Sequence, residues 1–376
     1  MIYFDNASTT KINAQVLRTY KKVLETYFAN PSGTHTLARD VARLQDKARS
    51  EILDTLKYTD GKVIFTSGAT EANNLAIIGL YQAYANRGNE IIISNFEHPS
   101  VREACDYLAK VHGVVINKVP IDANGVIDLK TLKKFLSDKT VLVSIMAVNN
   151  EIGAITNLSA IRKVLNGYPK VIFHSDVTQA LGKILVNLDV VDAFSFSAHK
   201  IHGLKGSGAL VLRRKLNPKP LVYGGSQEDG LRPGTHNAPA NIVLAQTVRL
   251  AVMSQQENIE LVGKLAQKLH TLLATRSDLF IINSTLDNPY IVNFSLKTVS
   301  ASIVLNALEN KEIYLGTTSS CSAKLHIPSH TILAISGDEK RANNALRVSF
   351  SATNTVDEVI TFFKVLMQII EGANYG

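Results

Sequence analysis

Short apolar segments alternate with helix-like amphipathic segments from about residue 14 to about residue 250. This alternation predicts a mostly parallel sheet with helices on both faces. Ligands in such sheets bind at the carboxyl ends of the strands, so residues just past these ends are the first candidates for a site. The candidate strands are 63–65, 90–94, 114–119, 141–146, 171–174, 193–197 and 208–212, with helical patterns such as 71–85, 101–111, 129–136 and 158–165 between them.

A chain of 376 residues is too long for one ordinary hydrophobic core, so two domains are expected. The part that follows the alternating region begins with a long helical stretch over about 241–275. It continues with apolar runs at 280–282 and 291–294 and a closing helix near 355–370, a pattern typical of a smaller α+β unit.

The composition is that of a soluble globular protein, with 45% apolar and 19% charged residues. No run approaches the roughly 18 apolar residues that span a bilayer, and the first residues lack the pattern of a secretory signal. Cys105 and Cys321 are the only cysteines, so we expect no disulfide framework and a reducing compartment, the cytoplasm. The net charge of +8 is compatible with an acidic partner such as tRNA, but the lysines are scattered, which favours an ordinary solvated surface.

Lys200 ends an apolar run that also delivers Ser197 and His199 into the glycine-rich segment 203–208. Asp176 ends another apolar run 24 residues earlier. A Schiff-base lysine, an acid for a pyridinium nitrogen and a phosphate cup are what pyridoxal phosphate needs from a protein. A lysine after a strand is usually a surface residue and an aspartate there usually caps a helix. Their joint occurrence, in this order, predicts a pyridoxal-phosphate site.

The phosphate cup is predicted at residues 67–70, where a strand gives way to a helix whose first N–H groups are unpaired. The Thr70 hydroxyl is an additional donor, and Ser197 and His199 are candidates for the remaining ones. A plain Ser/Thr helix cap is the alternative for this segment taken alone. Gln179, three residues after Asp176, is expected within reach of the phenolic oxygen of the cofactor ring.

His98 and Asn149 also follow predicted strands. A histidine at this place could stack on the cofactor and shuttle protons, or be a polar loop residue. Arg347 lies inside an apolar run and needs a carboxylate partner, which is either structural or the α-carboxylate of a substrate amino acid. Cys321 lies among small polar residues, which favours a reactive thiol, whereas Cys105 fits a helix pattern and is expected to fill the core.

Further motifs extend these observations over nearly the whole chain, at 3–10, 30–32, 66–74, 148–153, 176–179, 195–200, 232–235, 320–321 and 346–350. In combination they resemble the cysteine desulfurases of the class V aminotransferase group, pyridoxal-phosphate enzymes of fold type I. The long stretch between Cys321 and Arg347 is similar to the subgroup of housekeeping iron–sulfur and tRNA-thiolation enzymes. The resemblance implies an α/β large domain over 13–254 with a mostly parallel seven-stranded sheet, and a small α+β domain formed by 1–12 and 255–376.

The resemblance also implies an activity, the conversion of L-cysteine to L-alanine with the sulfur left as a persulfide on Cys321. Lys200 would bind the cofactor and remove the Cα proton, and His98 would stack on the ring and move protons. The implied cofactor contacts are Ala69, Thr70, His98, Asn149, Asp176, Gln179, Ser197, His199 and Lys200, with Thr235 from the other subunit of a homodimer. The implied substrate contacts are Asn30, Asn149 and Arg347.

The implied partner is a sulfur acceptor, either a tRNA-thiolating enzyme or an iron–sulfur scaffold protein. No stable nucleic-acid binding, no membrane and no metal site are expected, apart from a transient iron–sulfur contact at Cys321. The chain departs from the family at His202 and Leu204, where an aromatic residue and a proline are usual. The alternatives are another pyridoxal-phosphate lyase or aminotransferase, such as a selenocysteine lyase, and a sulfur-relay partner that has lost turnover.

Overall fold

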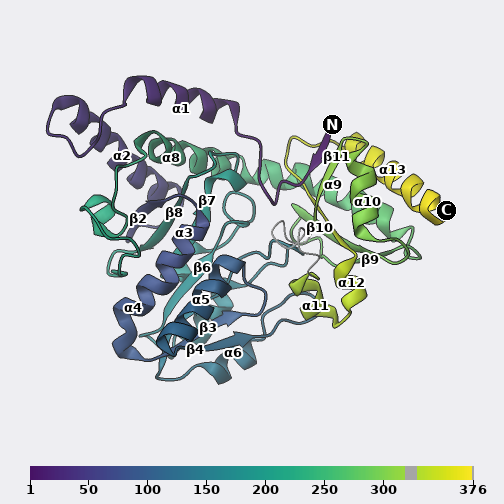
Figure 1. The fold of residues 1–376 in the computed structure, drawn as a ribbon, viewed down its shortest axis with the longest axis horizontal. Helices are drawn as coiled ribbons and strands as arrows, with labels where there is room; N and C mark the ends of the chain where they lie inside the picture. Colours follow the sequence, from purple (N-terminus) through teal and green to yellow (C-terminus); the bar gives the residue numbers. More distant parts are fainter. Residues whose placement is uncertain (318–327, 375–376) are drawn as a thin grey trace.

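The computed structural model describes residues 1–317 and 328–374, and Figure 1 shows its fold. The larger sheet has seven strands, as predicted. Only β8 runs antiparallel to its neighbours, β2 and β7; the other pairings are parallel. In spatial order the strands are β2 (Gly61–Thr66), β8 (Gly208–Arg213), β7 (Ala193–Ser197), β6 (Ile172–Asp176), β5 (Thr140–Ser144), β3 (Glu90–Ser94) and β4 (Val115–Val119).

Both faces of this sheet are covered, which is why its central strands are buried throughout. All residues of β5, β6 and β7 are buried. One hydrophobic cluster joins the sheet to α3 (Ala69–Asn74), α4 (Leu80–Tyr84) and α5 (Pro99–His112). Another joins it to α2 (Thr36–Thr55), α6 (Leu129–Phe135), α7 (Leu158–Leu165) and α8 (Ala238–Met253). The predicted α/β sheet with helices on both faces is therefore confirmed.

Two predicted helices are interrupted. The helix expected over 71–85 contains a π-helical turn, Leu75–Gly79, between α3 and α4, and ends in a 3₁₀ turn, Ala85–Arg87. The Gly79 carbonyl accepts a hydrogen bond from the Lys219 backbone at 2.9 Å, a contact that hydrophobic periodicity does not reveal. The stretch 241–275 is two helices, α8 and α9 (Gln255–Ala274), which meet at Ser254.

The smaller sheet has five strands and brings the two ends of the chain together. Its order is β1 (Ile2–Phe4), β11 (Ile313–Thr317), β12 (Ala345–Ser349), β10 (Ile291–Leu296) and β9 (Phe280–Ile282). The first strand lies parallel to β11, and the other pairings are antiparallel. With this sheet lie α9, α10 (Ala301–Glu309), α11 (His330–Ser336), α12 (Glu339–Asn343) and α13 (Val356–Asn374). This is the expected α+β unit; the domain boundaries themselves stay a prediction.

The remaining helix, α1 (Ala14–Thr26), packs with α2 against α8 at one margin of the molecule (Figure 1). Both α1 and α8 begin at an asparagine whose side chain accepts hydrogen bonds from the first turn, Asn13 and Asn237. Within the described part of the chain, none of the helices combines the length and apolar character needed to cross a membrane.

Candidate functional site

The strand ends that the sequence singled out meet at one edge of the larger sheet, with Asp176 near the middle. Asp176 is the last residue of β6 and is buried. One of its carboxylate oxygens accepts a hydrogen bond from the Asn73 side chain at 2.7 Å, and the other from the Thr178 backbone N–H at 2.9 Å. These donors hold the carboxylate at a fixed place, as a partner for a cationic ring nitrogen requires.

Asn73 was not among the predicted site residues, although it connects α3 to Asp176. Its side-chain N–H group also donates to the Ser100 hydroxyl at 2.9 Å. Its side-chain oxygen is buried and has no hydrogen-bond partner among the described residues. The sequence contained one signal for it, because Asn73 follows Thr70 by three residues and therefore shares its helix face.

His98 caps the start of α5, where its Nδ1 accepts a hydrogen bond from the Ser100 backbone N–H at 3.2 Å. Burial lowers the pKa of His98 below its usual value; the Asp176 charge opposes this shift, while Lys200 and Arg102 add to it. The ring is therefore held neutral near physiological pH, with Nδ1 as an acceptor and the proton on Nε2. A neutral imidazole with this orientation can accept and return a proton.

The residue before His98 is a second buried acid that the sequence reasoning missed. Glu97 accepts hydrogen bonds from the Ser94 hydroxyl and from the Met146 backbone N–H, the latter at 2.9 Å. Burial raises the pKa of Glu97 to about 8, so the side chain is protonated at neutral pH. Its other carboxyl oxygen has no partner within the described residues. Only its position beside His98 could have indicated it, because a strand-end glutamate is usually solvated.

Lys200 follows β7 directly, in the one-turn helix Ala198–Lys200. Its amine donates to the backbone carbonyls of Ala7 and Ser8, at 2.6 and 2.7 Å. The segment that leaves β1 therefore lies against the amine. His199 points to the same segment, with Nδ1 at 3.2 Å from the Thr9 hydroxyl. Burial lowers the pKa of His199 to about 4, and the charge of Lys200 contributes, so the imidazole is neutral.

Gln179 lies in the loop after β6 and is buried. Its amide NH₂ donates to the Ala7 carbonyl at 2.9 Å, the same carbonyl that accepts from Lys200. Its amide oxygen accepts from the Lys183 amine at 3.0 Å. The structure therefore places Gln179 next to Lys200, and its contact with the cofactor ring stays a prediction.

The start of α3 has the form of an anion cup. Its N-cap residue is Gly68, which has no side chain to cap the helix, so the ordinary Ser/Thr cap is absent here. The Ser67 backbone N–H is instead bonded to the Glu71 carboxylate at 2.8 Å, and the Ala69 N–H to the Ser197 hydroxyl at 2.7 Å. A side chain at Gly68 would place its Cβ at 3.2 Å from the same hydroxyl, so a glycine keeps the space open. Thr70 is exposed at the rim.

Asn149 uses its polar atoms to hold its own loop. It is fully buried; its side-chain oxygen accepts from the backbone N–H groups of Glu151 and Ile152, both at 2.9 Å. Its NH₂ donates to the Phe96 carbonyl at 3.2 Å and lies 3.4 Å from the Thr331 hydroxyl. Asn149 therefore connects the loop after β5 to the segments around His98 and α11, and its contact with cofactor or substrate stays a prediction.

Arg347 has a carboxylate partner within the chain. Its guanidinium donates to Asp5 at 2.9 Å, to the Ser8 hydroxyl at 2.7 Å and to the Asn150 carbonyl at 2.8 Å. Its Nε is buried and has no partner among the described residues. Gly316 lies against this pair, since a Cβ there would approach Asp5 to 2.4 Å. Of the two predicted partners, the structure shows the structural one, and the contact with a substrate carboxylate stays a prediction.

Replacing Arg347 by leucine is expected to lower the free energy of unfolding by roughly 3 kcal/mol, because Asp5 and the Asn150 carbonyl lose their buried donor. Urea denaturation of the cofactor-free protein measures this change. Arg347→Lys keeps the charge and should lose less. An unchanged denaturation midpoint for the leucine variant would show that the Asp5–Arg347 pair contributes nothing to stability.

Asn30 and Thr235 lie apart from the residues around Lys200. Asn30 is in the exposed turn between α1 and α2, where its side chain accepts from the Ser32 backbone N–H at 3.0 Å. Thr235 is exposed on the loop that precedes α8. A single chain thus does not assemble the complete predicted site. Cys321, the predicted nucleophile, lies outside the described residues.

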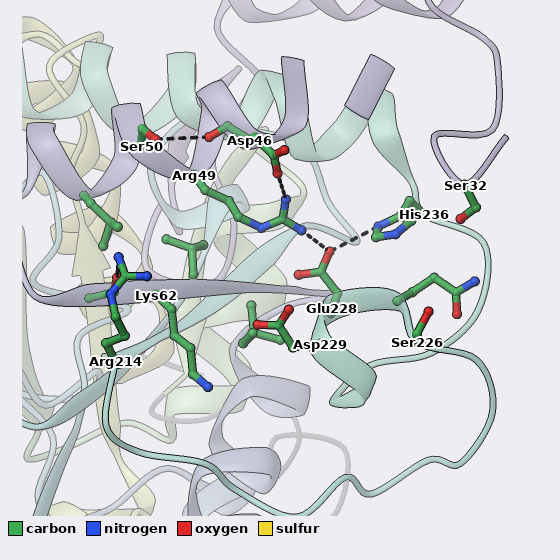
Figure 2. Close-up of a pocket in the computed structure, with 15 residues that line it drawn as sticks. Ser32, Asp46, Arg49, Ser50, Lys62, Arg214, Ser226, Glu228, Asp229 and His236 are labelled. Atoms are coloured by element: carbon green, nitrogen blue, oxygen red, sulfur yellow. Dashed lines mark hydrogen bonds and ion pairs between the residues drawn. The ribbon is translucent and has the colours of Figure 1, made fainter. Parts of the chain in front are cut away.

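The loop that carries Thr235 is held by a buried glutamate (Figure 2). One Glu228 carboxylate oxygen pairs with Arg49 at 2.5 Å and with His236 at 3.1 Å, and the other accepts from the Phe65 backbone N–H at 2.9 Å. Glu228 and Asp229 both have left-handed backbone angles, with φ of 49° and 57°. Such angles cost about 1–3 kcal/mol each and persist only where contacts fix them, so the carboxylate contacts define the shape of this loop.

Known proteins share this architecture over its full length. The Aminotransferase class-V family model matches residues 2–362. A "NifS/IcsS protein homolog" of Lactobacillus delbrueckii subsp. bulgaricus is 36% identical, over 99% of this chain and 97% of its own. A "Cysteine desulfurase IscS" of Dictyoglomus turgidum is 35% identical, over 98% of this chain and 94% of its own.

Solved structures agree with the sequence comparison. A "NIFS-LIKE PROTEIN" superposes with a TM-score of 0.91 at 32% identity, over 98% of this chain and 99% of that one. A structure described as "SspA in complex with cysteine" has a TM-score of 0.80 at 29% identity, over 94% of this chain and 100% of that one. These matches confirm the predicted fold class, and the chain belongs to the class-V aminotransferase family.

Proposed function

We propose that the protein is a pyridoxal-phosphate-dependent cysteine desulfurase, which converts L-cysteine to L-alanine and keeps the sulfur as a persulfide on Cys321. The observation that carries this proposal is the meeting of Lys200, Asp176 and His98 at one sheet edge beside the start of α3, whose N-cap residue is a glycine. Relatives named cysteine desulfurase, at 34–35% identity, support the choice of reaction. A structural neighbour described in complex with cysteine supports the choice of substrate.

The residues present fit pyridoxal phosphate. Asp176 is a buried carboxylate with fixed donors, which suits a pyridinium nitrogen. The start of α3, with Ala69, Thr70 and Ser197, suits the phosphate, and Lys200 offers an amine for the aldehyde. When bound, the cofactor supplies an electron sink for the carbon atoms of the substrate. Asn149 and His199 complete the proposed set of cofactor contacts within the chain.

The protein groups then have separate tasks. The Lys200 amine, once it leaves the Ala7 and Ser8 carbonyls, is the base for the Cα proton. The His98 imidazole remains neutral and transfers protons within the site. The Cys321 thiolate attacks the substrate sulfur: an S–S bond forms and the Cβ–S bond breaks. The carbon skeleton takes up protons to give alanine, and Cys321 keeps the sulfur as a persulfide.

Arg347 with Asn30 is proposed to bind the α-carboxylate of the substrate. The unpaired Nε of Arg347 supports its part, because a buried N–H group favours a ligand acceptor. Asn30 requires a second subunit or a movement of its turn, since it is exposed in the single chain.

A homodimer is proposed because Asn30 and Thr235, the predicted site residues that lie apart from Lys200, are on a part of the surface with exposed apolar side chains. Large apolar side chains are exposed on α1, in the turn that follows it, on α2 and before the Thr235 loop, and exposed apolar surface often marks a contact between proteins. A second copy seated there would cover them and bring the Thr235 hydroxyl to a neighbouring cofactor phosphate. The exposed residues are Leu17, Leu24, Phe28, Leu37, Val222 and Tyr223.

The sulfur acceptor is proposed to be a partner protein, either a tRNA-thiolating enzyme or an iron–sulfur scaffold. The protein is proposed to be located in the cytoplasm. A reducing compartment is consistent with a persulfide as a working intermediate and with the buried free thiol of Cys105.

Purified protein supplied with L-cysteine, pyridoxal phosphate and a thiol reductant is expected to release sulfide and alanine in equal amounts. Sulfide is measured colorimetrically and alanine by chromatography. Formation of a keto acid in place of sulfide would identify an aminotransferase. A protein that takes up the cofactor but consumes no cysteine would contradict the proposed function.

A further inference from the structure

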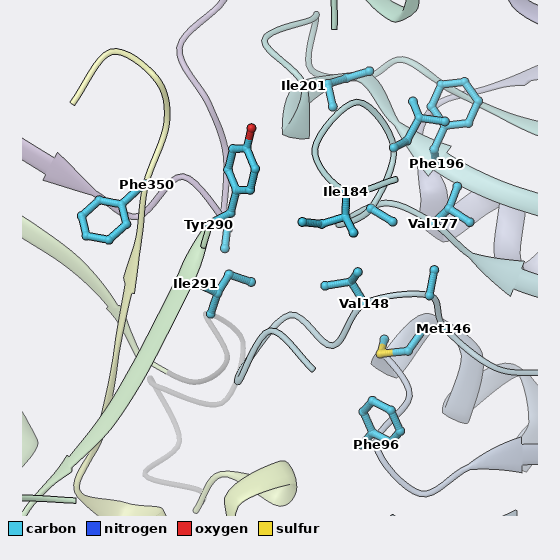
Figure 3. Close-up of a cluster of buried hydrophobic side chains, with 14 of the residues drawn as sticks. Phe96, Met146, Val148, Val177, Ile184, Phe196, Ile201, Tyr290, Ile291 and Phe350 are labelled. Atoms are coloured by element: carbon cyan, nitrogen blue, oxygen red, sulfur yellow. The ribbon is translucent and has the colours of Figure 1, made fainter. Parts of the chain in front are cut away.

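A buried lysine outside the predicted site, Lys183, points towards the cofactor region. Its side chain is only 9% exposed, and its amine donates to the Gln179 amide oxygen at 3.0 Å. The turn that carries it is rigidly packed: Gly182 has a φ of 68°, and a Cβ there would lie 2.6 Å from Ala251. Figure 3 shows Val177 and Ile184, which flank the turn, within the cluster of buried hydrophobic side chains.

Stability does not explain this lysine. Among the described residues, 1–317 and 328–374, no carboxylate forms an ion pair with Lys183. Burial lowers the pKa of Lys183 to about 7, and the charges of Lys200 and Arg347 contribute. A buried amine without a carboxylate destabilises the fold, and a methionine would fill the same space without that penalty.

The contacts of Lys183 instead orient a neighbour. The Gln179 amide lies between two amines, since its oxygen accepts from Lys183 and its NH₂ donates to the Ala7 carbonyl, which also accepts from Lys200. Because the Lys183 amine donates here, the oxygen end of the amide faces Lys183 and the NH₂ end faces the Lys200 side. In its protonated form, which predominates below about pH 7, Lys183 also polarises the amide and makes its N–H groups stronger donors.

Lys183 and Lys200 also face the same space. A cavity of about 960 Å³ lies between the N-terminal segment, the start of α9 and the residues that follow β12, and both amines line it together with Thr10 and Tyr290. The charge of a protonated Lys183 therefore acts on Lys200, with the Gln179 amide and the Ala7 carbonyl between the two amines.

We propose that Lys183 is a positioning residue for the cofactor: it fixes the Gln179 amide with its NH₂ towards the Lys200 side, and so presents a donor to the anionic ring oxygen of pyridoxal phosphate. This inference rests on the proposed function, because it assumes that the cofactor binds at Lys200. It adds to that function a residue that acts through another and does not itself touch the cofactor.

The test is the absorbance of the cofactor-loaded protein as a function of pH, for wild type, Lys183→Met and Lys183→Arg. In the methionine variant, Gln179 is no longer oriented to donate to the ring anion, and a nearby positive charge is lost. Both losses favour the protonated form of the bound cofactor, so the pH midpoint of its absorbance change should rise by about one unit. Lys183→Arg keeps the charge and the donor and should shift the midpoint less.

Lys62→Met is the matched control, since the Lys62 amine likewise donates to an amide oxygen, that of Asn217 at 3.1 Å, on another part of the molecule. It should titrate as wild type. Thermal unfolding of the cofactor-free proteins shows whether the turn itself is damaged. If Lys183→Met does not fold, Lys183→Gln takes its place; it removes the charge and shortens the side chain, so the same rise of the midpoint is expected.

Equal midpoints for wild type and the methionine variant would overturn the inference while leaving the desulfurase proposal intact. An equal shift in the arginine and methionine variants would also overturn it, because packing alone would then explain the effect. Failure of the wild-type protein to take up pyridoxal phosphate would overturn the inference and the proposed function together.

Discussion

Replacement of Lys200 by alanine is expected to abolish both the covalent attachment of pyridoxal phosphate and the release of sulfide from L-cysteine. The Lys200 amine is the group that the fold holds beyond β7, against the Ala7 and Ser8 carbonyls. Loss of a positioned base alone lowers a rate by roughly 10²- to 10⁴-fold, and here the cofactor anchor is lost as well.

Borohydride reduction followed by peptide mass spectrometry measures the attachment. In wild type the reduced cofactor should be found on the peptide that contains Lys200, and in the alanine variant on none. Lys205→Ala is the control, because Lys205 lies in the same glycine-rich segment and is exposed. Labelling of Lys183 in the wild-type protein would show that the wrong buried amine has been assigned.

Replacement of Cys321 by alanine is expected to abolish sulfide release while cysteine still changes the spectrum of the bound cofactor. The spectral change should survive because Lys200, Asp176 and the start of α3, which are proposed to bind the cofactor, are unchanged in this variant. Sulfide release should be lost because the Cys321 thiol is the group proposed to accept the sulfur. The persulfide itself should be detected by mass spectrometry as one added sulfur atom on the Cys321 peptide of the wild-type protein.

Cys105→Ala is the matched control for this experiment. Cys105 is fully buried on α5, and burial raises the pKa of its thiol far above neutrality, so it is inert as a nucleophile. Its replacement should leave sulfide release unchanged. Persistent sulfide release by Cys321→Ala would show that Cys321 is not the nucleophile.

The large sheet could be predicted because parallel buried strands leave an unambiguous apolar pattern. The predicted segments 90–94 and 193–197 coincide with β3 and β7. The convergence of His98, Asp176 and Lys200 followed from the same pattern, since the carboxyl ends of neighbouring parallel strands share one edge. The helix breaks at Gly79 and Ser254 were missed because they depend on local backbone contacts, which have no periodic signature.

The contacts that complete the site could not be predicted for a related reason. Ala7 and Ser8 bind Lys200 through backbone carbonyls, and every residue has one. The pairing of Asp5 with Arg347 joins residues 342 positions apart, so only the folded chain reveals it. Lys183 resembled any other lysine in the sequence until its burial and its contact with Gln179 were visible.

The parallel pairing of β1 with β11 has a consequence for the order in which the enzyme matures. On the ribosome the first ten residues have no strand to join until residues 313–317 have emerged, and Asp5 has no guanidinium partner until Arg347 follows. The seven-stranded sheet can assemble well before that time, because all its strands precede residue 214. Ala7 and Ser8, which bind the Lys200 amine, therefore gain the support of the smaller sheet only at the end of synthesis.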